Sequence, residues 1–84
     1  MSLKLFFFAG LRETLGSGAE TLPWPESVET VGELRDLLAA RGDSWQSLTR
    51  TKNLRTAVNQ KMVGFDAPLK DGDEVAFFPP VTGG

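Results

Sequence analysis

The chain has 84 residues and a net charge of −2, from nine basic and eleven acidic side chains. This length predicts one small domain, and 40% hydrophobic residues suffice for one compact core. The slight acidic excess argues against nucleic-acid binding, which normally requires a basic surface. Cysteine and histidine are absent, which excludes thiolate nucleophiles, disulfides, the usual zinc sites and histidine acid–base chemistry. We therefore expect no metal site and no active site formed by this chain alone.

No targeting or membrane segment is evident. The longest early apolar run, residues 5–9, is shorter than the core of a secretory signal, which has about 7–15 apolar residues. No stretch approaches the roughly 20 apolar residues of a membrane span. We therefore expect a cytoplasmic protein with no membrane partner.

The first third of the chain predicts a pair of short strands. Residues 4–9 are aromatic and aliphatic, which favours a buried strand, and residues 11–15 predict one helical turn. Residues 16–18 (GSG) then break the chain, and residues 19–22 predict a second strand that ends at Pro23. The two strands are expected to form a hairpin with a wide connection.

The clearest predicted element is a helix after Ser27. Thr30 is predicted to be the N-cap, and Glu33 to complete a capping box with it. Arg41 is expected in the last turn, and Gly42 is expected to end the helix. One apolar stripe is predicted to face a sheet, and it comprises Val31, Leu34, Leu37 and Leu38.

The second half predicts a short turn at residues 43–50 and further short strands. Residues 57–58 and 62–63 suggest two strands around a tight turn, while residues 71–73 (DGD) and Glu74 suggest a solvated turn. Residues 74–78 alternate, with Val75 and Phe77 on one face and Ala76 and Phe78 on the other. Pro79 follows and ends the sheet.

The fold class predicted from this order is α+β. We expect a mixed sheet of four to five strands with one main helix packed across it. The order strand–strand–helix–strand–strand matches the β-grasp arrangement of ubiquitin-like proteins. The predicted organisation is a β-grasp domain over residues 1–78, followed by a flexible Gly-Gly tail over residues 79–84.

The tail itself is the strongest candidate for chemistry. It consists of Pro79, Pro80, Val81, Thr82, Gly83 and Gly84. The prolines favour an extended exit, and six extended residues reach at most about 20 Å. The glycines lack Cβ atoms, so a narrow channel in another protein can admit them. A terminal Gly-Gly alone is more typical of a frayed chain end than of a reactive tail.

Three segments make the functional interpretation of the tail more specific. Together they resemble the MoaD family, the small sulfur-carrier subunits of molybdopterin synthase. They are residues 5–13 (LFFFAGLRE), 57–60 (AVNQ) and above all 72–84 (GDEVAFFPPVTGG). The resemblance spans nearly the whole chain.

The resemblance implies a carrier mechanism centred on Gly84. In this family a ubiquitin-activating-type partner, MoeB-like, adenylates the C-terminal glycine with ATP. A persulfide donor then supplies the sulfur that converts the glycine into a thiocarboxylate. The tail enters the large synthase subunit, MoaE-like, and donates sulfur to cyclic pyranopterin monophosphate. The implied assembly is a heterotetramer of two small and two large subunits, in which the small subunit binds no cofactor and is not catalytic by itself.

Two apolar residues near the tail are candidates for the partner interface. Phe78 is predicted to face away from Val75 and Phe77, and Met62 lies on a neighbouring predicted strand. Position alone leaves Phe78 equally compatible with a second core layer. The family resemblance favours contact with the large subunit and the activating enzyme for both residues.

Three other functions stay open from the sequence. One is a sulfur carrier of another pathway, either ThiS-type thiazole synthesis or transfer-RNA thiolation. A second is a ubiquitin-like modifier whose Gly84 forms an isopeptide bond with a target lysine. Both use the same acyl-adenylate, so the tail does not separate them from the first hypothesis. The third is an interaction domain whose tail does not react.

Overall fold

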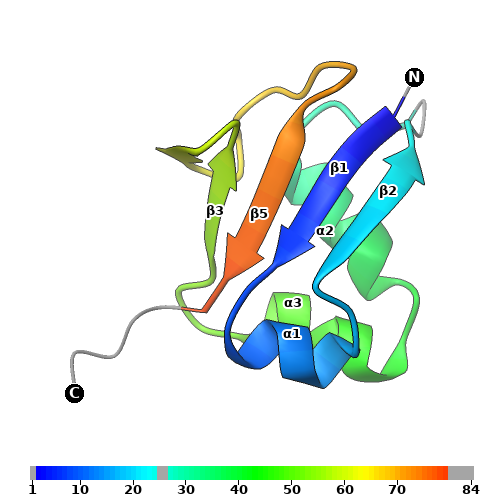
Figure 1. The fold of residues 1–84 in the computed structure, drawn as a ribbon, viewed down its shortest axis with the longest axis vertical. Helices are drawn as coiled ribbons and strands as arrows, with labels where there is room; N and C mark the ends of the chain where they lie inside the picture. The colour runs from blue at the N-terminus through cyan, green and yellow to red at the C-terminus, as the bar shows by residue number, and fades with distance from the viewer. Residues whose placement is uncertain (1, 25–26, 80–84) are drawn as a thin grey trace.

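The computed structural model describes residues 2–24 and 27–79. Within them one mixed sheet of five strands has the order β2-β1-β5-β3-β4. Its central strands β1 and β5 are parallel, and the other neighbours are antiparallel. Figure 1 shows helix α2 crossing behind the sheet, with α1 and α3 at one end. The elements are β1 (Ser2–Phe7), α1 (Gly10–Leu15), β2 (Ala19–Pro23), α2 (Val31–Ala39), the 3-10 turn η1 (Asp43–Gln46), α3 (Ser47–Arg50), β3 (Arg55–Val58), β4 (Lys61–Val63) and β5 (Glu74–Phe78).

This arrangement confirms the predicted α+β, β-grasp fold. Its first and last strands pair in parallel at the centre of the sheet, although about 70 residues separate them. β1 differs from the expected strand at residues 4–9, since it begins at Ser2 and ends at Phe7. Phe8 and Ala9 leave the strand because the chain turns there into α1.

The core lies between α2 and the inner face of the sheet. Alternation along β1 and β5 fully buries Leu3, Leu5, Phe7, Val75 and Phe77. The rings of Phe7 and Phe77 stack with centroids 6.1 Å apart. The helix contributes Val31, Leu34 and Leu38, all fully buried.

Helix α2 begins as predicted and ends earlier. The capping box is present, since the Glu33 amide donates to Thr30 Oγ1 at 3.2 Å and the Thr30 amide donates to Glu33 Oε1 at 3.1 Å. The helix ends at Ala39, so the expectation that Arg41 lies in its last turn is wrong. The chain reverses at Gly42, whose φ is 83°.

The predicted apolar stripe of α2 is wrong at one residue. Leu37 is 39% exposed, whereas Leu34 and Leu38 are buried. At about 100° of rotation per residue, Leu37 lies about 100° from Leu38 around the helix, which places it at the edge of the sheet-facing side.

Arg41 instead joins the helix layer to β2. Its guanidinium donates to Glu20 Oε1 at 2.9 Å, in a two-pronged ion pair, and lies over the ring of Trp45. The pKa of Glu20 is lowered from its ordinary value of 4.5, and the main cause is the hydrogen bond from Arg41. Partial burial of Glu20 acts in the opposite direction, and the positive charge of the guanidinium lowers the pKa further.

We expect Glu20→Gln to lower the free energy of unfolding at pH 7 by about 0.5–1 kcal/mol, because the pair is partly exposed. A carboxylate whose pKa is lowered by folding contributes its full stabilisation above its unfolded pKa. That stabilisation is lost as the pH falls below 4.5 through the lowered value. Urea unfolding of both proteins should therefore give stabilities that converge in acid. Glu13→Gln, at an exposed glutamate of α1 with no ion pair among the described residues, should match wild type throughout.

The inner face of β3 contains one buried hydroxyl group that lacks a hydrogen-bond partner among the described residues. Thr56 is 1% exposed and pairs in register with Phe77, and its Oγ1 has no hydrogen-bond partner among the described residues. A buried hydroxyl without a partner destabilises the folded state.

We expect Thr56→Val to stabilise the protein by about 1 kcal/mol, since valine keeps the shape and removes the unpaired oxygen. The midpoint of urea unfolding should rise, with an unchanged dependence on urea. A fall in the midpoint would mean that the hydroxyl has a partner in solution.

Candidate functional site

The face of the sheet opposite α2 carries an apolar surface built by alternation and register. Phe6 of β1 lies opposite Ala76 of β5, and Ala57 of β3 lies opposite the same alanine. Beyond them Met62 of β4 pairs with Ala57. Figure 1 shows α2 on the other side of the sheet, so none of the helices in the described chain lies over this face.

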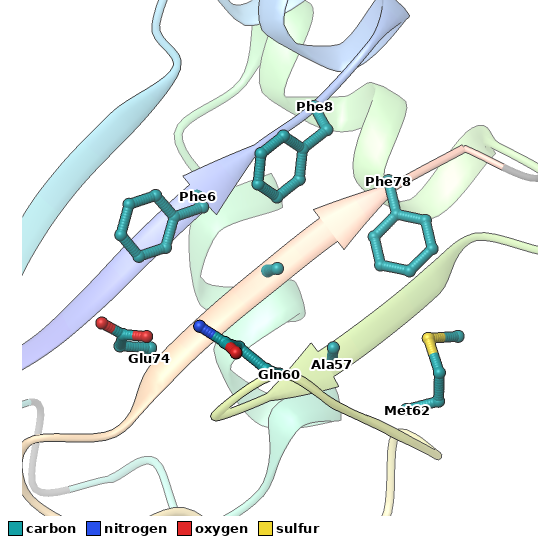
Figure 2. Close-up of a pocket in the computed structure, with 8 residues that line it drawn as sticks. Phe6, Phe8, Ala57, Gln60, Met62, Glu74 and Phe78 are labelled. Carbon is teal, nitrogen blue, oxygen red and sulfur yellow. The ribbon is translucent and has the colours of Figure 1, made fainter.

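This outer face is hollowed into a depression of about 490 Å³. Figure 2 shows the rings of Phe6, Phe8 and Phe78 around it, with Met62 on the far side. Phe6 and Phe8 stack with centroids 6.4 Å apart. Phe8 is 49% exposed and Met62 56% exposed. We call this the outer-face depression; its lining is Phe6, Phe8, Ala57, Gln60, Met62, Glu74, Ala76 and Phe78.

The structure confirms the outward orientation predicted for Phe78 and places Met62 on the same surface. Their role as partner contacts stays a prediction. Sequence reasoning missed Phe6 and Phe8. The signal was present in the run of three phenylalanines, because in a strand the two neighbours of an inward Phe7 must point outward.

A group of hydrogen bonds around the buried Asp73 holds one rim of the depression. The Asn59 amide nitrogen donates to Asp73 Oδ1 at 2.9 Å, and the Glu74 backbone amide donates to Asn59 Oδ1 at 3.0 Å. Asp73 Oδ2 also accepts the Lys70 amide at 2.8 Å. These bonds tie the β3–β4 turn, which carries Gln60, to the start of β5. Asp73 is 5% exposed, so the expectation of a solvated turn is wrong for this residue.

The lining of the depression is typical of a protein-binding surface rather than of a catalytic site. Glu74 is the one ionisable side chain in its lining, and aromatic and small apolar residues make up most of the remainder. Buried aromatic side chains with a polar rim are typical of protein–protein interfaces. Within residues 2–24 and 27–79, no three acidic side chains come together in a way that suits a metal ion.

The tail leaves the domain at the edge of this surface. Phe78 lines the depression and is the last residue of β5, and Pro79 follows it directly. Pro80, Val81, Thr82, Gly83 and Gly84 lie outside the described residues, so their predicted insertion into a partner stays a prediction. No helix in the described part of the chain has the length and apolar character needed to cross a bilayer.

Comparison with known proteins places this architecture in a family. The model of the ThiS family matches residues 5–84, which includes the terminal Gly-Gly. The molybdopterin synthase sulfur carrier subunit of Escherichia coli is 49% identical over 98% of this chain and 99% of its own length. Small archaeal modifier protein 3 of Haloferax volcanii is 38% identical over the full length of both proteins.

A solved structure agrees with the sequence matches. It is a putative molybdopterin converting factor, subunit 1, from Pyrococcus furiosus, with 29% identity and a TM-score of 0.78 over 96% of this chain and 99% of that one. The chain therefore belongs to the ThiS family, and it resembles the molybdopterin synthase sulfur carrier subunits within it along its whole length.

Proposed function

We propose that this protein is the sulfur carrier subunit of a molybdopterin synthase. The observation that carries the proposal is the 49% identity to the Escherichia coli carrier, which extends over nearly all of both chains. The family match continues through Gly84, the residue on which carrier chemistry depends. The absence of cysteine and histidine agrees with a chain that transports sulfur on its C-terminus and obtains its acid–base groups from partners.

The chemistry proposed for Gly84 has two stages. Its carboxylate attacks the α-phosphate of ATP on a MoeB-like activating enzyme and releases pyrophosphate, which gives an acyl-adenylate. A persulfide sulfur then attacks the acyl carbon and displaces AMP. A thiol cleaves the resulting acyl disulfide and leaves a thiocarboxylate on Gly84. ATP is thus used by the activating partner, and this chain binds no cofactor of its own.

The proposed site of delivery is a large, MoaE-like subunit. The tail, from Pro79 to Gly84, would enter its active site and donate sulfur to cyclic pyranopterin monophosphate, within a heterotetramer of two small and two large subunits. The outer-face depression would bind the body of the large subunit, because it adjoins Pro79 and exposes Phe8 and Met62. Docking on this surface restricts where the tail can go, which raises its effective concentration at the active site.

A second candidate, a ubiquitin-like modifier, is favoured by one observation. A relative that matches along the full length of both chains is named as a small archaeal modifier protein. Such a modifier would pass the Gly84 acyl group to a lysine of a target protein. Both functions begin with the same activated glycine, so only the acceptor separates them.

The test is the intact mass of the purified protein after incubation with ATP, a MoeB-like enzyme and a persulfide donor. We expect the mass change for one oxygen replaced by sulfur. The loaded protein should then convert cyclic pyranopterin monophosphate to molybdopterin once the large subunit is added. Loading without that conversion would contradict the synthase role, and lysine conjugates in cells would support the modifier.

A further inference from the structure

A sharp turn joins β1 to α1, and Ala9 occupies its most restricted position. The Phe8 carbonyl accepts a hydrogen bond from the Leu11 amide at 3.2 Å, so residues 8–11 form a β-turn. Ala9 is the second residue of that turn, with φ 55° and ψ −133°. These angles are those of a type II′ turn, where glycine is the usual residue. An alanine there is strained, because its Cβ is crowded at positive φ.

Other residues with positive φ in the described chain are easier to explain. Asp43, Asn53 and Asn59 belong to the residue types that tolerate left-handed backbone. Gln60, with φ 70°, shares with Asn59 the two-residue hairpin turn between β3 and β4, a kind of turn that requires positive φ at both central residues. Ala9 has no polar side chain that would compensate locally. Strain of this kind persists only where the surroundings impose it, and it concentrates at functional sites.

The surroundings of the turn impose the positive φ from both sides. The Phe8 amide donates to the Phe77 carbonyl at 3.2 Å, which continues the pairing of β1 with β5. Leu11 is 4% exposed and belongs to the core, whereas Phe8 is 49% exposed on the outer face. The chain must therefore pass from one face of the sheet to the core layer within three residues. A negative φ at Ala9 would break the turn and remove Leu11 from the core.

With φ kept positive, alanine and glycine differ in how far the turn can move. Glycine has broad allowed regions at positive φ, whereas alanine at φ 55° and ψ −133° lies outside the small left-handed region open to L-residues, so crowding at its Cβ leaves the backbone little room to move. Alanine at this position therefore limits the direction of the neighbouring Phe8, whose ring stacks on Phe6 at the edge of the depression. An interface side chain that is already ordered loses less entropy on binding.

We propose that Ala9 is a positioning residue for partner docking. Its strained, restricted backbone holds the Phe8 ring in the outer-face depression, where the large synthase subunit binds. This inference rests on the proposed function, and it assigns a role to a residue outside the lining of the depression.

The test compares three chains made by chemical synthesis: wild type, Ala9→Gly and a chain with D-alanine at position 9. Titration calorimetry measures affinity for the large synthase subunit of the same organism, and thermal unfolding measures stability. Ala9→Gly should raise Tm, because the strain is relieved, and should weaken affinity about threefold to tenfold, the cost of ordering one side chain on binding. D-alanine prefers positive φ and is also restricted, so it should raise Tm and keep the wild-type affinity.

Asn53→Gly is the matched control, since Asn53 also has positive φ but lies outside the outer-face depression. Its affinity should equal that of wild type. Equal affinity of Ala9→Gly and wild type would overturn the inference and leave the proposed function intact. Weakened binding of the D-alanine chain would also overturn it, because the methyl group itself would then contact the partner. If the wild-type protein does not bind the large subunit, that result contradicts the proposed function itself, and with it the role of Ala9.

Discussion

Addition of one alanine after Gly84 is expected to abolish sulfur loading without changing thermal stability. The extension moves the terminal carboxylate to a residue with a Cβ, which a channel shaped for glycine excludes. Stability should not change, because the core residues of the described chain lie between Leu3 and Phe77. The measurement is intact mass after incubation with ATP, the activating enzyme and the persulfide donor. The unmodified mass should persist for the extended chain, while wild type loads fully.

The matched control is the same alanine added before Met1. Because β1 and β5 are parallel, Ser2 lies at the opposite end of the sheet from Phe78, so this extension is remote from the exit of the tail. It should load at the wild-type rate. Deletion of Gly84 should fail to load in the same way as the C-terminal extension. Loading of either C-terminal variant would show that the terminal glycine is not the acyl carrier, and a large fall in Tm would show that it is structural.

Phe78→Ala is expected to weaken binding of the large subunit by about 2 kcal/mol, or about 30-fold, as for an aromatic anchor in an interface. The loss of stability should be smaller, because Phe78 is only partly buried on the outer face. Its neighbour Phe77 is fully buried on the other side of the same strand. Phe77→Ala should therefore destabilise the fold by about 3–5 kcal/mol through the cavity that it leaves. Calorimetric titration and urea unfolding separate the two effects.

Leu37→Ala provides the matched control for loss of an exposed apolar side chain. Leu37 is 39% exposed on α2, in the layer behind the sheet, so its truncation should leave affinity for the large subunit unchanged. If Leu37→Ala and Phe78→Ala weaken binding equally, the outer-face depression is not the docking surface. If Phe78→Ala destabilises the fold as much as Phe77→Ala, Phe78 belongs to the core.

The functional site could be predicted in part. The outward orientation of Phe78 followed from alternation along residues 74–78, and the structure confirms it. Phe6 and Phe8 were not recognised as part of the same surface, because they are about 70 residues from Phe78 in the chain. Only the parallel pairing of β1 with β5 brings these residues together. The tail itself lies outside the described residues, so the sequence and the family relation remain the support for its role.

Local features of the chain were enough for the elements and their order. The capping box of Thr30 and Glu33 determined where α2 begins, and alternation determined which residues of β5 face the core, because hydrogen bonds and side-chain direction act over a few residues. Tertiary structure alone decided that Leu37 is exposed, that Arg41 pairs with Glu20 and that Asp73 is buried. It also decided the strained backbone of Ala9. These features depend on how helix and strands distant in sequence lie against one another, which no local pattern specifies.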